Sequence, residues 1–156
     1  MDNPKRKHPR LKGYDYGKDG AYFLTICTEK RQCILSKLAV GRGLAPAVRL
    51  LPAGRIVAEE LDALLDRFPG LAIVQSVIMP NHIHLLLRLT AAGASPRPTP
   101  YVEAYTAVDV VRVLKSVTTR RWNAARGRMG ERLWQSSFHD HVIRDENDFV
   151  KPLELY

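Results

Sequence analysis

Cysteine is scarce in this chain of 156 residues, where Cys27 and Cys33 are the only examples. So small a number argues against a disulfide framework. The five residues between them match no common zinc-binding spacing, and Cys27 lies in an apolar run. We therefore interpret both cysteines as ordinary residues.

Long apolar runs are also absent, since no uninterrupted stretch reaches the roughly 20 residues that cross a bilayer. The N-terminal residues 1–7 are basic, but neither an apolar segment nor a small-residue cleavage site follows them. We expect no signal peptide, no membrane partner and a cytoplasmic location. The composition, 46% hydrophobic and 26% charged, is that of a globular chain long enough for one sizeable core.

Acidic residues are few: 16 Asp and Glu face 24 Lys and Arg, which leaves a net charge of +8. A basic excess of this size suits a polyanionic partner, nucleic acid before a membrane surface. The alternative is a basic protein from a genome rich in arginine. Charge alone does not separate the two.

Apolar spacing and turn residues predict the order of the elements. Residues 1–20 are expected to form a basic arm that precedes a single domain over residues 21–156. Strands are predicted at 21–28, 71–79, 82–89 and 138–144, and loops at 38–50 and 91–100. Helices are predicted at 53–68 and 102–125, with a last helix from about residue 145 to Tyr156. This order suits an α+β domain in which helices pack on an antiparallel sheet.

His82 and His84 flank Ile83 on one predicted strand. Residues i and i+2 of a strand share a face, so two imidazoles would project together and could chelate one ion. Imidazole binds Zn, Mn, Co or Ni readily and Mg less readily. The alternative is a pair of half-buried histidines satisfied by hydrogen bonds. The run Leu85–Leu87 marks a core strand. Two adjacent polar rings that point inward from such a strand would need partners or a function to offset the cost of their burial. Two ligands alone do not complete a metal site.

The predicted helix over 102–125 carries much of the basic charge. The candidate DNA-binding residues there are Arg112, Lys115, Arg120, Arg121 and Arg126. With Arg128 and Arg132, they are opposed only by Glu131 between residues 112 and 132. Such clustering favours phosphate contacts, and the alternative is a solvated helix face. Trp122 could stack a base, although tryptophan more often anchors a core.

Two further features could carry chemistry. His139 and His141 form a second pair on one strand face, which could bind a metal, contact phosphate or lie on the surface; we favour a surface or supporting role. Tyr156 ends the sequence, and its hydroxyl, with an ordinary pKa of about 10, would need activation to attack a phosphate. A metal that polarises the phosphate supplies part of that activation. The alternative is a frayed terminal residue.

Three stretches in this order carry a family resemblance. They are Arg10–Tyr16 followed by Ala21–Thr25, then Val77–Leu87, then Leu133–Asp145. The chain resembles the IS200-like transposases, and more closely their REP-associated tyrosine transposase branch, which is of the HUH type. The histidine–hydrophobic–histidine signature of that branch falls on His82 and His84. The resemblance spans roughly residues 8 to 151.

The resemblance implies a ferredoxin-like α+β domain in which His82 and His84 bind Mg or Mn. That metal would polarise a phosphate of single-stranded DNA, often an imperfect palindrome folded as a hairpin. A tyrosine on the last helix would attack the phosphate, form a 5′-phosphotyrosine link and release a 3′-hydroxyl. Members of the family include monomers and dimers, so a homodimer is one expected state.

The end of the sequence departs from the family pattern. The tyrosine position of the family falls on Leu155, one residue before Tyr156, and one residue rotates a helical side chain by about 100°. Pro152 would also disturb that helix. The family's later asparagine or glutamine metal ligand is absent, which suggests a truncated copy. The hypotheses are therefore a transposase with Tyr156 as nucleophile, a non-catalytic DNA-binding remnant, and an unrelated metal-dependent phosphodiesterase.

Overall fold

The fold is seen in a computed structural model, which describes residues 20–39, 47–90 and 105–143. Residues 1–19 of the expected arm over 1–20, the loop over 91–100 and the last helix with Tyr156 lie outside the described residues, and Gly20 is the first residue of a strand.

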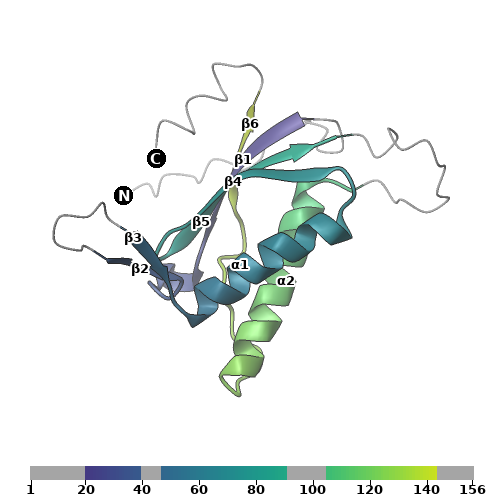
Figure 1. Ribbon diagram of the computed structural model, residues 1–156. Coiled ribbons are helices and arrows are strands. Elements are labelled where there is room, and N and C mark those ends of the chain that lie inside the picture. Colours follow the sequence, from purple (N-terminus) through teal and green to yellow (C-terminus); the bar gives the residue numbers. More distant parts are fainter. Residues whose placement is uncertain (1–19, 40–46, 91–104, 144–156) are drawn as a thin grey trace, which may run out of the picture.

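A four-stranded sheet forms the centre of the described structure. Its strands are β1 (Gly20–Cys27), β4 (Leu71–Ile78), β5 (His82–Leu89) and β6 (His139–Ile143). They lie in the order β4-β5-β1-β6, and each strand is antiparallel to its neighbours. Helix α1 (Pro52–Arg67) connects to β4, and helix α2 (Ala107–Ala125) precedes β6 (Figure 1). This βαββαβ order confirms the ferredoxin-like α+β prediction.

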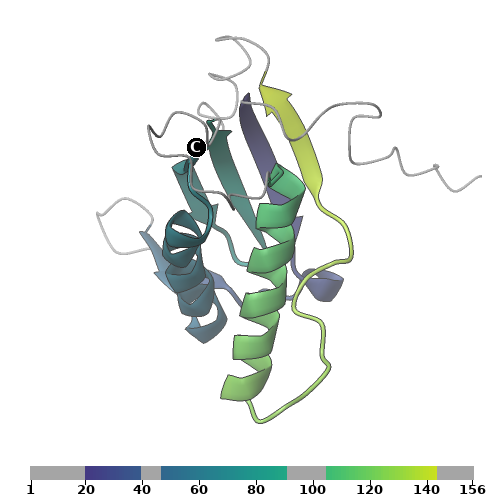
Figure 2. The ribbon, with the colours of Figure 1, turned by 90° about the vertical axis from the view of Figure 1, so that its right-hand side faces the viewer.

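Both helices cover the same face of the sheet (Figure 2). The alternation of side chains along β5 explains why: Ile83, Leu85 and Leu87 are fully buried and belong to the core that includes both helices. His82 and His84 alternate with them and are only half-buried. The two rings therefore lie on the sheet face opposite the helices, and our expectation that they point into the core was wrong.

Helix α2 begins later than the apolar pattern indicated. Tyr105 and Thr106 are not helical, and the helix starts at Ala107. The reason is a capping box: Thr106 Oγ1 accepts the backbone N–H of Asp109 at 3.2 Å, and the Asp109 carboxylate accepts the Thr106 N–H at 2.8 Å. Among the described residues, neither helix is long and apolar enough to cross a membrane.

A two-stranded hairpin interrupts the predicted loop over residues 38–50. Strands β2 (Ser36–Ala39) and β3 (Ala47–Leu50) pair antiparallel, after the short helical turn η1 (Glu29–Arg31). Most of their side chains are exposed, so the two strands lack the apolar alternation that marks a strand in a sequence. Backbone pairing alone defines them.

Candidate metal centre and nucleic-acid interface

The two histidine rings of β5 lie next to each other on the open face of the sheet. Their centroids are 4.6 Å apart and the ring planes are nearly perpendicular, at 82°. Across the strands, His82 is paired with Cys27 and His84 with Thr25 of β1. On the same face, Phe23 stacks on His84 with a centroid distance of 5.3 Å. The β-strand spacing and this stacking hold both rings side by side.

Each ring has its Nδ1 atom occupied by a neighbouring side chain. His82 Nδ1 lies 2.7 Å from Asn81 Oδ1, and His84 Nδ1 lies 3.0 Å from Thr25 Oγ1. With the proton on Nδ1, each ring donates to that oxygen, and Nε2 is the nitrogen that can coordinate a metal. Metal-binding histidines usually make this kind of supporting hydrogen bond. Asn81 Oδ1 only accepts, which favours the Nδ1–H tautomer in His82, and the Thr25 hydroxyl, which can accept or donate, is compatible with that tautomer in His84.

Burial keeps these imidazoles neutral. Partial burial, and next the charge of His82, lowers the pKa of His84 to about 4. Burial, and next the nearby cation of Arg31, lowers the pKa of His82. Neutral imidazole is the form that binds metal. The donor set thus fits one side of a divalent site, although the described residues hold no cluster of three or more potential metal ligands.

Thr25→Val is expected to weaken Mn²⁺ binding by about 10- to 100-fold, because valine keeps the shape of threonine but cannot support His84. Isothermal titration with MnCl₂ measures the affinity. Thr90→Val is the matched control, since it makes the same substitution just past the other end of β5, where the hydroxyl donates to the backbone oxygen of Gly70. Equal affinities for the parent and Thr25→Val would contradict the supporting role.

The metal-free protein is expected to lose stability as the pH falls from about 6.5 to about 4. The lowered pKa of His84 means that the unfolded chain binds a proton in this window while the folded chain resists it. Urea unfolding in the presence of a chelator, repeated across the window, should show a shallower pH dependence for His84→Gln than for the parent. Parallel curves would contradict this origin of the pH dependence.

The second histidine pair lies on the same face of the sheet as the first. His139 is paired with Thr25 and His141 with Phe23, and both histidines are exposed. His139 and His84 are therefore separated by β1, a lateral distance of about 10 Å between backbones. The described residues of the two pairs form no group of three or more potential metal ligands. The favoured surface role for His139 and His141 stays a prediction.

One residue near His82 was missed in the sequence. Arg31 is exposed, and its charge acts on the His82 ring. Lys30 and Arg31 both adopt the left-handed backbone region, with φ of 53° and 52°. Such a conformation costs roughly 1 kcal/mol or more for a residue with a side chain, and strained residues gather at functional sites. No spacing pattern in the sequence could have indicated this residue.

The basic residues of α2 fall into two groups. Arg121 binds Glu59 and Glu60 of α1, so its guanidinium ties the two helices together, and 39% of its side chain stays exposed. Arg126 pairs with Glu131 and stacks over Trp122, 4.6 Å from the ring centroid. Trp122 itself packs against the core. The DNA-binding role of Arg121 and Arg126 stays a prediction.

The other three candidates lie on the exposed side of α2 or toward the segment after it. Arg112 is exposed and 3.6 Å from Asp109. Lys115 Nζ donates to the backbone oxygen of Gln135 at 2.6 Å. Arg120 is exposed, and it forms no ion pair among the described residues.

Comparisons with known proteins bear on the fold. No family model matches the chain. An uncharacterized protein of Haemophilus influenzae is 28% identical over 163 residues, which cover 96% of this chain and 84% of that protein. The solved structure of a REP-associated tyrosine transposase bound to a REP hairpin matches with a TM-score of 0.59 at 17% identity, over 93% of this chain and 67% of that one. This chain has the fold of a REP-associated tyrosine transposase.

A second solved structure supports the same transposase fold. It is a "putative transposase" from Deinococcus radiodurans R1, with a TM-score of 0.51 and 20% identity over 94% of each chain. The structural similarity thus extends over nearly the whole chain and confirms the resemblance in fold. On this transposase fold, the histidine pair occupies β5, next to the central strand β1.

Proposed function

We propose that this chain binds single-stranded or hairpin DNA and cleaves and rejoins it through a 5′-phosphotyrosine intermediate. The observation that carries the proposal is the pair of neutral imidazoles on the open sheet face, each with Nδ1 held by a neighbour. The transposase fold and the net charge of +8 agree with a DNA partner.

Different residues would bind the metal, attract the phosphate and attack it. His82 and His84 would present their Nε2 atoms to Mg²⁺ or Mn²⁺, which when bound polarises the scissile phosphate. Arg31, beside His82, would attract a DNA phosphate to the same place. The hydroxyl oxygen of Tyr156 would bond to phosphorus while the bond from phosphorus to the 3′ oxygen breaks. The tyrosine hydroxyl would lose its proton as this bond forms, and the 3′ oxygen would take up a proton and leave as a hydroxyl.

The decisive experiment is a search for a covalent protein–DNA adduct. The full chain would be incubated with a labelled pool of single-stranded hairpins and MnCl₂ or MgCl₂, and then run on a denaturing gel. We expect an adduct that requires the metal and disappears in Tyr156→Phe and His82→Ala. His139→Ala is the matched control, because that histidine shares the sheet face but lies across β1 from the pair.

Each of the other outcomes supports a different assignment of nucleophile or function. An adduct that survives Tyr156→Phe would assign the nucleophile to another residue. Metal-dependent cleavage without any adduct would indicate a phosphodiesterase and overturn the proposal. Hairpin binding with neither cleavage nor adduct would favour the non-catalytic remnant.

A further inference from the structure

Thr28 directly follows β1 and is fully buried, and its hydroxyl has two acceptors. Thr28 Oγ1 donates to Gln32 O at 2.8 Å and to Asn81 O at 3.0 Å. A hydroxyl carries one proton, so the two carbonyl oxygens share it. Gln32 comes directly after the η1 turn, and Asn81 comes directly before His82. One buried side chain therefore joins two segments that are far apart in the sequence.

Neither carbonyl oxygen needs this hydroxyl in order to be paired. The N–H of Ile34 donates to Gln32 O at 3.0 Å, and the N–H of Thr28 itself donates to Asn81 O at 3.0 Å. Each acceptor thus keeps a backbone donor without the side chain. A valine at this position would have the same shape and would leave neither oxygen without a partner. What the hydroxyl adds is a direct link between the two segments.

On one side, the link reaches the turn that carries Arg31. Arg31 N donates to Thr28 O at 3.0 Å. Gln32 N donates to Glu29 O at 3.3 Å. Lys30 and Arg31 have positive φ angles, of 53° and 52°, and such conformations persist only where the surroundings hold them. The Thr28 hydroxyl makes one of the bonds that hold this turn, so the position of Arg31 depends on it.

On the other side, the link reaches the support of the first histidine. Asn81 Oδ1 lies 2.7 Å from His82 Nδ1. In the sheet, Cys27 is paired with His82, so Thr28 is the residue that follows the partner of this histidine. The charge of Arg31 acts on the same ring. The Thr28 hydroxyl therefore connects the turn of Arg31 with the residue that orients His82.

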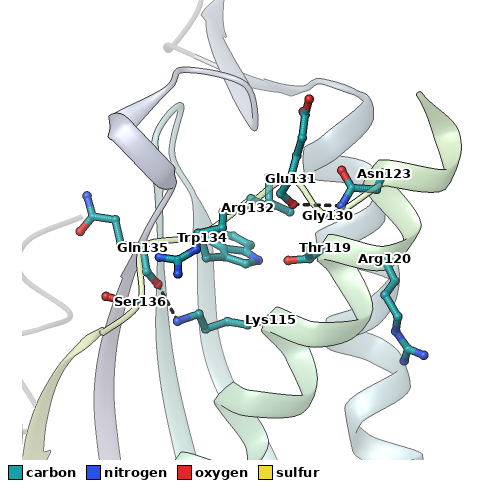
Figure 3. Close-up of a pocket in the computed structure, with 11 residues that line it drawn as sticks. Lys115, Thr119, Arg120, Asn123, Gly130, Glu131, Arg132, Trp134, Gln135 and Ser136 are labelled. Carbon is teal, nitrogen blue, oxygen red and sulfur yellow. Dashed lines mark hydrogen bonds between the residues drawn. The ribbon is translucent and has the colours of Figure 1, made fainter. Parts of the chain in front are cut away.

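Thr28 is itself fixed from the side of α2. Trp134 forms a β-bridge with Thr28, and Trp134 Nε1 donates to Thr118 Oγ1 of α2 at 2.8 Å. The next residue, Gln135, accepts a hydrogen bond from Lys115 Nζ at 2.6 Å through its backbone oxygen (Figure 3). Because packing and hydrogen bonds lock Thr28 in place, its hydroxyl can hold other residues in a defined position.

We propose that Thr28 is a positioning residue of the histidine site, whose hydroxyl holds the turn of Arg31 at a set distance from His82. The inference rests on the proposed function, because it specifies what places the Arg31 cation beside the metal and the phosphate. At that place the cation has two opposite effects: it repels a bound Mn²⁺ and attracts a DNA phosphate. Both effects fall with distance, so both should weaken when the hydroxyl is removed and the turn relaxes.

The first measurement is a titration of the full chain with MnCl₂ at low salt and without DNA. Arg31→Gln should bind Mn²⁺ about threefold more tightly than the parent, because a repelling charge is removed. In a Thr28→Val background, the same substitution should change the affinity by less than about 1.5-fold. Such a loss of effect is expected only if the two residues are coupled.

The second measurement is the affinity for the labelled hairpin pool in the presence of a chelator. Arg31→Gln should weaken binding about fivefold in the parent, because an attracting charge is removed. In the Thr28→Val background, the weakening should be less than about twofold. Arg31→Gln thus changes the two affinities in opposite directions, and a general disturbance of the fold would not produce that pattern.

Thr28→Ser is the rescue variant, because it returns the hydroxyl, and with it both effects of Arg31→Gln should regain their parental size. Ser36→Ala is the matched control. It also removes a buried hydroxyl, but one that donates at 2.9 Å to Ile78 O of β4 and not to the turn before His82. Both effects should be unchanged in it. Urea unfolding checks that each variant is folded, and Thr28→Ala replaces Thr28→Val if the valine variant is not.

Two results would overturn the inference while leaving the proposed function standing. One is an effect of Arg31→Gln that has the same size in the parent and in Thr28→Val. The other is an Arg31→Gln variant that matches the parent in both measurements, because the site would then contain no charge for Thr28 to position. A parent protein that binds neither Mn²⁺ nor hairpin DNA would instead remove the proposed function, and the positioning role with it.

Discussion

His84→Ala should bind Mn²⁺ at least about 100-fold more weakly than the parent and cleave hairpin DNA about a thousandfold more slowly. Thr25 Oγ1 lies 3.0 Å from Nδ1 of His84, which fits metal coordination through Nε2, and His82 alone would be a single ligand. Loss of the metal removes the polarisation of the phosphate, worth several kcal/mol in the transition state. Titration with MnCl₂ and single-turnover cleavage measure the two effects.

The stability of His84→Ala separates loss of metal from loss of fold. The stacked contact with Phe23, at 5.3 Å, is worth roughly 1 kcal/mol, so the variant should remain folded. Added imidazole should restore part of the Mn²⁺ affinity, because the alanine leaves space for a free ring beside Phe23. Unchanged Mn²⁺ affinity in a folded His84→Ala would show that β5 does not hold the metal centre.

The parts of the fold that follow local rules could be predicted from the sequence. The alternation of Ile83, Leu85 and Leu87 marks β5 because side chains of a strand alternate between faces. The same rule placed His82 and His84 together. The rule does not say which face is covered by helices, and the histidines were therefore expected on the wrong one.

What the sequence did not indicate depends on residues far apart in the chain. Thr25 supports His84 across 59 residues, which requires the register between β1 and β5. Arg121 looks like its basic neighbours on α2, yet it meets Glu59 and Glu60 only after α1 and α2 pack together. The charge pattern of a sequence shows where the cations are along the chain, whereas the fold decides which of them meet a carboxylate from another element.

Gly54→Ala should destabilise the protein by about 2 kcal/mol or more, although alanine favours a helix by about 1 kcal/mol over glycine. Gly54 is buried in the first turns of α1, where a Cβ atom would lie only 2.0 Å from the backbone oxygen of Leu35. The backbone must move to relieve that overlap. Leu35 is fully buried and its N–H donates to Pro80 O, so the shift would reach the turn before His82.

Urea unfolding measures the free energy of unfolding. The sign of its change shows whether helix propensity or the overlap with Leu35 governs Gly54→Ala. Ala58→Gly on the same helix is the matched control: it should destabilise by about 1 kcal/mol through helix propensity alone. If propensity governed both positions, Gly54→Ala would stabilise the protein by a similar amount. A stabilised Gly54→Ala would mean that α1 can move away from Leu35 at little cost, and the turn that positions His82 would then not depend on this contact.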